Sequence, residues 1–276
     1  MTTLTTDRIE SLRQRRSAGE NLSILAREAG LSWQRLWGLL NPPGPAGIGP
    51  VLRATGKGAL TEKYRPLALD AIWGQDAAVR VLRKFAADPY PRAFMFEGET
   101  GTGKTSAAMA LAAELGCDLT QRPQEFGGVH SIASGEQTAE TVRETRRQMY
   151  LTPFCGSGWK VFIVNEADRM ALPAETIWLD VLEDLPARTA VIFTTNNPER
   201  LSQRFKDRCT RLYFESDAAT LRPAAERLVA AIWKAETGKA CNSTGAGAVV
   251  EAAQADGQLS FRRVVQQAGM MLSKGW

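Results

Sequence analysis

The sequence has few of the features that mark secreted, membrane-embedded or disulfide-stabilised proteins. Its 276 residues include only four cysteines, which lie far apart and form no Cys-x-x-Cys pair. This spacing argues against a disulfide framework or a zinc site and favours a reducing compartment. No stretch approaches the ~18 consecutive apolar residues of a membrane span, and the first residues contain no apolar signal core. We therefore expect a cytoplasmic protein with no membrane contact.

The net charge of the chain is also small, and the positive excess is confined to one segment. Hydrophobic residues make up 44% of the chain and charged residues 23%, which excludes disorder as the main state. The net charge is +4. Residues 1–60 hold eight Lys/Arg and four Asp/Glu, so the excess lies in this segment and the rest of the chain is balanced. A local positive excess is a modest indication of contact with a polyanion such as DNA.

Proline and glycine mark the clearest boundary. Residues 41–50 contain four prolines and three glycines, which exclude a helix or a central strand. We interpret residues 41–59 as a linker between a small unit, residues 1–40, and a larger body.

The body alternates between strand and helix patterns. Apolar runs at 93–97, 161–164 and 190–194 predict buried strands, and the segments 106–115, 136–149 and 174–183 are typical of helices. This alternation predicts an α/β core, residues 60–215, with a parallel sheet covered on both faces. Strand signals stop after Glu215, and the segments 218–236, 246–255 and 260–273 predict a three-helix lid over residues 216–276.

A phosphate-binding motif follows the first strand. The segment 98–105 fits G-x-x-x-x-G-K-[ST] and lies between a strand and a helix, which is the context of a P-loop. Lys104 is expected to reach the β- and γ-phosphates, and the Thr105 hydroxyl to bind Mg²⁺. No N-K-x-D motif follows, which favours ATP over GTP. The loop residues expected to contact the nucleotide are Gly98, Glu99, Thr100, Gly101, Thr102, Gly103, Lys104, Thr105 and Ser106.

Polar residues follow the second and third strands. Asn165 occupies the position where such sites usually carry a Mg²⁺-binding acid, so we expect it to contact the metal through water. Glu166 is the candidate general base. The lost charge at Asn165 predicts weaker Mg²⁺ affinity or turnover. Asn196, after the third strand, is the candidate that faces the γ-phosphate.

Several motifs together resemble the clamp-loader AAA+ ATPases of the replication factor C type. They are Glu62-Lys-Tyr-Arg-Pro66, Ile72-Trp-Gly-Gln75, Ala133-Ser-Gly-Glu136 with Thr141-Val-Arg143, Leu182-Glu-Asp-Leu-Pro186 and Asp207-Arg-Cys209. The resemblance covers residues 60–276. It implies an AAA+ parallel sheet followed by a helical lid, with ATP and Mg²⁺ as cofactors.

The resemblance also implies individual roles. Arg208 matches the arginine that completes the ATP site of a neighbouring subunit, although a surface salt bridge is the alternative. Asn196 matches the first sensor and Arg262 the second, with Arg263 exchangeable for it. Ile72 and Gln75 match the region near adenine.

Three departures from the family pattern stand out. Asn165 replaces an aspartate, Asp207 replaces the serine of a Ser-Arg-Cys signature, and the chain ends at Trp276 without the further helical collar that such subunits carry. We therefore expect any homo-oligomer, or hetero-oligomer with other AAA+ subunits, to form through the AAA+ faces alone or through a partner.

Residues 20–40 resemble a helix-turn-helix, with Gly30 at the turn. DNA binding is one interpretation, and docking on a protein is the other, because tryptophans on the second helix also suit a protein interface. The candidate DNA-binding residues are Arg13, Arg16, Ser32, Trp33, Gln34 and Arg35.

Three functions remain open. The first is a clamp-loader-type ATPase acting on DNA in replication, with a sliding clamp or a recombination protein as further partner. The second is an AAA+ regulator of DNA transposition that assembles on DNA. The third is an ATP-binding scaffold whose turnover is lost through Asn165. The replication-type motifs favour the first, and the absent collar favours the second.

Overall fold

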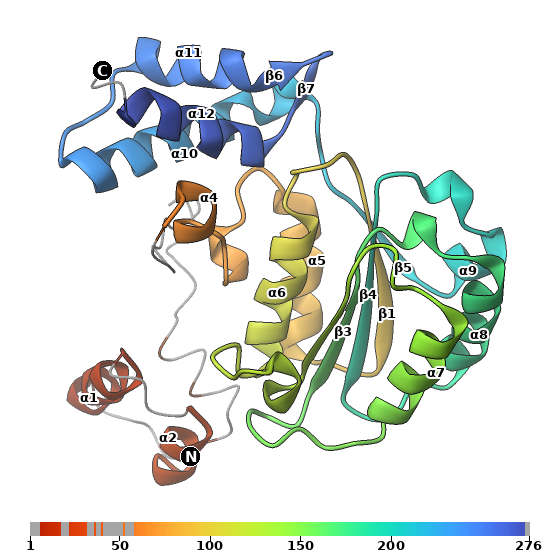
Figure 1. Cartoon of the computed structure of the whole chain (residues 1–276). Coiled ribbons are helices and arrows are strands. Elements are labelled where there is room, and N and C mark those ends of the chain that lie inside the picture. The colour runs from red at the N-terminus through yellow and green to blue at the C-terminus, as the bar shows by residue number, and fades with distance from the viewer. Residues whose placement is uncertain are drawn as a thin grey trace.

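The computed structural model describes residues 6–17, 22–31 and 58–273, together with Leu36, Leu40 and Leu52. Its centre is a five-stranded parallel sheet in the order β2-β3-β4-β1-β5 (Figure 1). The strands are β1 (Arg92–Glu97), β2 (Val129–Ile132), β3 (Lys160–Val164), β4 (Thr189–Thr195) and β5 (Thr210–Tyr213). The predicted α/β class with a parallel sheet is confirmed.

Helices cover both faces of this sheet (Figure 1). One face carries η1 (Leu69–Ala71), α5 (Asp76–Ala87) and α6 (Lys104–Leu115). The other carries α7 (Ala139–Gln148), α8 (Leu172–Glu183) and α9 (Gln203–Asp207). Short connections complete the core: α4 (Leu60–Lys63), η2 (Gln124–Gly127), η3 (Ala167–Arg169) and η4 (Pro198–Arg200).

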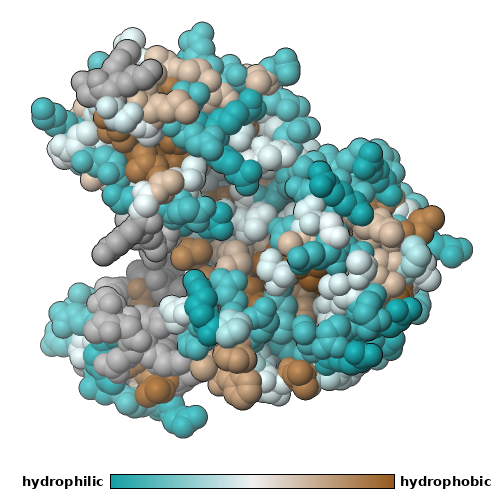
Figure 2. Space-filling model, viewed as in Figure 1, coloured by the Kyte–Doolittle hydropathy of each residue, from teal (hydrophilic) through white to brown (hydrophobic). Residues whose placement is uncertain are grey.

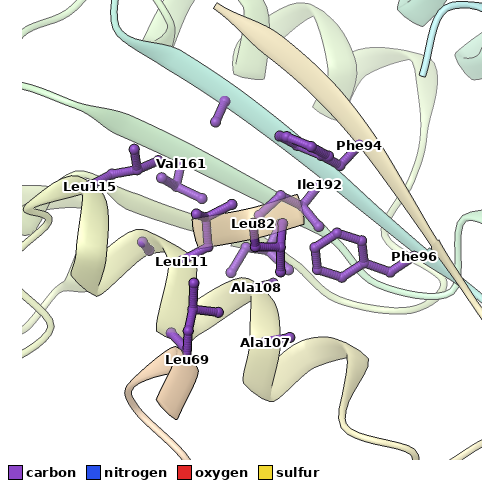
Figure 3. Packing of buried hydrophobic residues seen from close by; sticks show 14 of the residues in the cluster. Leu69, Leu82, Phe94, Phe96, Ala107, Ala108, Leu111, Leu115, Val161 and Ile192 are labelled. Carbon is purple, nitrogen blue, oxygen red and sulfur yellow. The ribbon is translucent and has the colours of Figure 1, made fainter. Parts of the chain in front are cut away.

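The central strands are apolar throughout because both of their faces are buried. In β1, Phe94 and Phe96 point to the α5/α6 face, whereas Met95 points to the α7/α8 face. Figure 3 shows Phe94 and Phe96 next to Leu82 of α5 and Leu111 of α6. This packing fixes the carboxyl end of β1, where the P-loop begins.

The edges of the sheet depart from the prediction. The sequence indicated three strands, and the structure adds β2 and β5 at the two edges. Both are four residues long and carry polar or exposed side chains, such as Ser131 in β2 and Arg211 in β5. An edge strand needs fewer apolar residues, so neither segment shows the buried pattern from which the other strands were predicted.

The C-terminal segment contains three helices, as predicted, and one addition. They are α10 (Ala218–Thr237), α11 (Ser243–Ala253) and α12 (Phe261–Ser273), and we call this segment the lid. Between α11 and α12 lies an antiparallel pair, β6 (Gln254–Ala255) and β7 (Gln258–Leu259), which contradicts the expectation that strands end at Glu215. Two-residue strands are too short to leave a periodic signal.

A small apolar cluster joins the lid to the segment that precedes α5. Tyr64 and Trp73 from that segment pack with Leu228, Ile232 and Val265 of the lid. The lid is therefore attached to the core through a shared interior as well as through the chain.

The N-terminal unit has an interior of its own. Its helices α1 (Thr6–Ser17) and α2 (Leu22–Glu28) contribute Leu12 and Leu25 to a cluster with Leu36 and Leu40. Gly30 follows α2 with φ +65°, a left-handed conformation that glycine adopts without strain. The helix-turn-helix interpretation of residues 20–40 stays a prediction, because most of its second helix lies outside the described residues.

The surface in Figure 2 is mainly hydrophilic, with apolar residues in small separate patches. Within the ranges that the structure describes, no helix has the length and apolar character to span a bilayer. Nor do those ranges contain a cluster of three or more His, Cys, Asp or Glu side chains that could hold a metal ion.

Candidate functional site

The P-loop connects β1 to α6 at the carboxyl edge of the sheet. Gly98 has φ +140°, and a Cβ there would collide with the Phe214 carbonyl oxygen, so only glycine fits between these strand ends. Gly103 is the left-handed N-cap of α6, and Lys104 and Thr105 begin that helix. The loop therefore has the backbone form that leaves N–H groups at a helix N-terminus available to phosphate.

Lys104 lies in the interior of this loop. Its Nζ donates to the carbonyl oxygens of Gly98 at 2.6 Å and Glu99 at 2.8 Å, and to Oδ1 of Asn196 at 2.8 Å. Burial lowers the pKa of this ammonium from 10.5 to about 8, although the carboxylates of Glu99 and Asp168 oppose the shift. Burial removes the water that stabilises the ammonium charge. A bound phosphate would stabilise that charge instead, so Lys104 is well placed to bind an anion.

Asn165 and Thr105 face each other across the carboxyl ends of the strands. The Thr105 hydroxyl donates to Asn165 Oδ1 at 3.1 Å. Both atoms are hard oxygen ligands of the kind that Mg²⁺ prefers. The pair therefore fits the metal site that the sequence predicts, with one charge fewer than a Thr–Asp pair.

Glu166 sits beside this pair in a left-handed backbone conformation, with φ 51°. Its Oε2 accepts a hydrogen bond from the Ser134 hydroxyl at 2.5 Å and pairs with Nε of Arg169 at 3.0 Å. The backbone N–H of Glu166 donates to Oγ1 of Thr194 at 3.2 Å. The carboxylate is thus held next to the cleft, and its conformation depends on β4.

Asn196 reaches the P-loop from the end of β4. Its Nδ2 donates to Oγ1 of Thr100 at 3.1 Å, and its backbone N–H donates to Oδ1 of Asp168 at 3.3 Å. Because Lys104 also contacts its side chain, Asn196 links β4 directly to the loop.

These groups line a cleft of about 490 Å³ between the core and the lid. The expected residues in its walls are Ile72, Thr100, Gly101, Thr102, Gly103, Lys104, Thr105, Ser106, Asn165, Glu166, Asn196 and Arg262. Gly98 and Glu99 are not part of the lining, and they supply the carbonyl oxygens that hold Lys104.

The sequence did not predict every residue that lines the cleft. Tyr64, Trp73, Leu228, Phe261 and Val265 also line it. Tyr64 and Trp73 fall inside the motifs that carry the family resemblance, so the signal was present without a role attached to it.

Gln75, expected near the nucleotide, is absent from the cleft lining. Its Nε2 donates to the Glu215 carbonyl oxygen at 2.9 Å, and its Oε1 accepts from the Glu215 N–H at 2.8 Å. Nε2 also donates to the carbonyl oxygen of Thr102 in the P-loop at 3.4 Å. The buried side chain therefore joins the start of α5 both to the P-loop and to the junction between core and lid.

Arg208 lies away from the cleft of its own chain, at the end of α9. Its guanidinium pairs with Glu183 of α8, and Nη1 donates to the Arg204 carbonyl oxygen at 3.2 Å. Within its own chain, Arg208 therefore forms a surface salt bridge, which is the alternative to a role in a neighbouring ATP site.

The candidate DNA-binding residues fall largely outside the described parts of the chain. Arg13 and Arg16 belong to α1, but their side chains are not among those described. Residues 32–35, which include Ser32, Trp33, Gln34 and Arg35, lie outside the described residues.

Comparison with known proteins adds family context. Residues 74–218 match the family described as DNA polymerase III, delta subunit. The chain is 31% identical over 156 residues to replication factor C subunit 3 of Saccharomyces cerevisiae, a match that covers 56% of this chain and 44% of that protein. It is also 31% identical to the replication factor C small subunit of Picrophilus torridus, covering 56% and 48%.

A solved structure shares the fold. The Thermotoga maritima RuvB Holliday junction branch migration motor superposes with a TM-score of 0.58 at 15% identity, over 76% of this chain and 67% of that one. The chain matches a little under half the length of the replication factor C proteins.

Proposed function

The chain belongs to the family of DNA polymerase III delta subunits, and on that premise we propose that it is a clamp-loader-type AAA+ ATPase that binds ATP with Mg²⁺ and acts on DNA in replication. The observation that carries the proposal is the buried Lys104 in a complete P-loop, with Thr105 facing Asn165 and Asn196 at the same edge. The replication factor C relatives favour this function over regulation of DNA transposition.

Each group has a distinct role in this proposal. Lys104 would bind the β- and γ-phosphates, and Thr105 and Asn165 would hold Mg²⁺, with Asn165 contacting it through water. Mg²⁺, when bound, neutralises negative charge on the phosphates. Glu166 would accept a proton from the attacking water. Ser134 and Arg169 both contact Oε2 of this carboxylate. The other oxygen, Oε1, would therefore be the one that faces the water and takes its proton.

Arg208 would act on the nucleotide of a neighbouring subunit. Its side chain is 29% exposed and its partner Glu183 62% exposed, so the ion pair that holds it contributes little to stability. Exchanging this pair for a phosphate contact therefore costs little. Arg262 would contact phosphate within the same chain, because it lines the cleft at the start of α12.

For the partners, we propose DNA, other AAA+ subunits or further copies of this chain, and a sliding clamp or recombination protein. For the N-terminal unit, residues 1–40, we propose a tether to DNA or to a protein. For the remaining organisation, we propose a linker over residues 41–59, an ATPase core over residues 60–215 and a lid over residues 216–276.

One set of measurements tests the proposal. ATP affinity, steady-state hydrolysis and DNA binding are compared for the unaltered chain, Arg208→Ala and a chain lacking residues 1–50. Arg208→Ala should bind ATP normally but hydrolyse it at least tenfold more slowly, since an arginine supplied to the transition state has a large effect on rate. The deletion should weaken DNA binding and reduce its dependence on salt.

Three outcomes separate the alternatives. ATP binding without measurable turnover in the unaltered chain would identify a scaffold. Normal hydrolysis by Arg208→Ala would refute the role in a neighbouring subunit. An unchanged salt dependence after deletion would favour protein docking by residues 1–40.

A further inference from the structure

The side chain of Asn165 makes different contacts at its two ends. Oδ1 accepts from the Thr105 hydroxyl at 3.1 Å. Nδ2 donates to Oγ of Ser131 at 3.2 Å and to the Ile132 carbonyl oxygen at 3.2 Å. The amide therefore turns its acceptor toward the P-loop and its donor toward β2.

An amide at this position has a difficulty that a carboxylate does not have. A carboxylate presents an oxygen whichever way it rotates, whereas an amide rotated by half a turn presents an NH₂ group. An NH₂ group beside Thr105 would point partial positive charge at the place where Mg²⁺ is expected. The substitution of asparagine for aspartate therefore needs something that fixes the orientation of the amide.

Strand β2 provides the fixing groups. It pairs in parallel with β3, with Ser131 opposite Ile163, and the backbone N–H of Asn165 continues the ladder by donating to the Ile132 carbonyl oxygen at 3.0 Å. The Ser131 hydroxyl and the Ile132 carbonyl therefore lie next to Asn165 because of strand pairing. The hydroxyl can donate as well as accept, whereas the carbonyl can only accept. If the amide turned over, its oxygen would face the Ile132 carbonyl oxygen, and two acceptors would be opposed.

We infer that the Ile132 carbonyl selects the orientation in which the Asn165 oxygen faces Thr105, and that Ser131 is a positioning residue that holds the amide in place, so that together they support Mg²⁺ in the nucleotide site. The inference rests on the proposed nucleotide-binding function. Ser131 acts through Asn165 and not through the metal, because it contacts the end of the amide that points away from Thr105.

The test is a Mg²⁺ titration of the binding of a fluorescent, nonhydrolysable ATP analogue to the full chain. Ser131→Ala should raise the Mg²⁺ concentration for half-maximal binding about three- to tenfold, the effect expected for one hydrogen bond. The side chain of Ser131 is exposed, so the substitution should leave folding intact. Ser131→Thr retains the hydroxyl and should remain within about twofold of the unaltered chain.

The Asn165→Asp background supplies the matched control. A carboxylate presents an oxygen to Thr105 in either rotation, so Ser131→Ala should raise the Mg²⁺ requirement less there than in the native background. An unchanged requirement in the native background, or the same increase in both backgrounds, would overturn the inference while leaving the proposed function intact. Failure of the unaltered chain to bind the analogue at any Mg²⁺ concentration would overturn both.

Discussion

The two walls of the cleft are built in different ways. The core wall, residues 100–106 with Asn165, Glu166 and Asn196, is polar and is held by hydrogen bonds within a short stretch of strand ends. The lid wall comes from segments far apart in the sequence, and its apolar part is formed by Tyr64, Trp73, Leu228, Phe261 and Val265, beside the charged Arg262. The core wall therefore depends on local charge and backbone geometry, and the lid wall depends on burial.

The largest expected effect on nucleotide affinity comes from a substitution in the core wall. Lys104→Ala should weaken nucleotide binding at least tenfold, because hydrogen bonds to a charged group contribute ~1.5–3 kcal/mol each. Fluorescence anisotropy of a labelled ATP analogue measures the affinity. Lys84→Ala is the control, because it removes the same charge from an exposed position on α5. Equal affinities for the two variants would contradict the role of the core wall.

Lys104 also gives the core wall a pH dependence that serves as a second readout. In the free chain, burial lowers the pKa of Lys104 to about 8, and a bound phosphate would raise this pKa. At pH 8 the free lysine is partly deprotonated, so binding should take up a proton, and affinity should fall as the pH rises from 7 to 9. Calorimetry in two buffers with different ionisation enthalpies detects this uptake, which Lys104→Ala must lose.

An intermediate effect is expected where the two walls meet. Gly101 has φ +82°, and a Cβ there would collide with Oγ of Ser260, just before α12. The Gly101 carbonyl oxygen also accepts from the Arg262 N–H at 3.3 Å. Gly101→Ala should displace the start of α12 and move the lid wall away from the phosphates. Nucleotide binding, measured by fluorescence anisotropy of the labelled ATP analogue, should therefore weaken about three- to tenfold.

The control for this variant isolates the collision from the backbone strain. Gly257, in the turn between β6 and β7, has φ +73°, and a Cβ added there would meet no other atom within 4 Å. Both substitutions carry the left-handed strain of ~1–2 kcal/mol, but only Gly101→Ala should affect the nucleotide. If Gly257→Ala weakens binding equally, general destabilisation explains the effect.

The difference between the walls also explains what the sequence could predict. The P-loop, Asn165 and Asn196 could be located because each follows an apolar strand within a few residues, and parallel strands bring their carboxyl ends to one edge. In the lid wall only Arg262 was located, through the family resemblance. The rest could not be located, because it depends on contacts such as the one between Tyr64 and Glu236, which are 172 residues apart in the sequence. Gln75 shows the same limit, since besides Thr102 it bonds the backbone of Glu215, which no pattern near Gln75 indicates.

Edge strands and short elements were missed for a related reason. Buried strands are indicated by continuous apolar residues, whereas β2 contains His130 and Ser131 and β5 contains an exposed Tyr213. The orientation of Asn165 depends on β2, so the sequence showed the substitution at position 165 without showing what compensates for it.

The smallest expected effect tests whether burial holds the lid wall. Glu236 at the end of α10 accepts from the Tyr64 hydroxyl at 2.5 Å and pairs with Nζ of Lys63 at 2.7 Å. Exposed ion pairs contribute ~0–1 kcal/mol, so Glu236→Gln should lower the opening free energy of α10 by less than ~1 kcal/mol. Hydrogen exchange of peptides from α10 measures this change, and nucleotide affinity should fall by less than threefold.

Ile232→Ala provides the contrast on the same helix. Its side chain is fully buried in the cluster with Tyr64 and Trp73, and removal of such a side chain typically costs ~2–5 kcal/mol. The exchange protection of α10 should therefore fall much further than in Glu236→Gln. A larger loss in Glu236→Gln would mean that charge holds the lid wall as well as the core wall. In that case both walls would depend on charge, and the contrast between them would disappear. Raising the salt concentration would then loosen the lid and the phosphate site together.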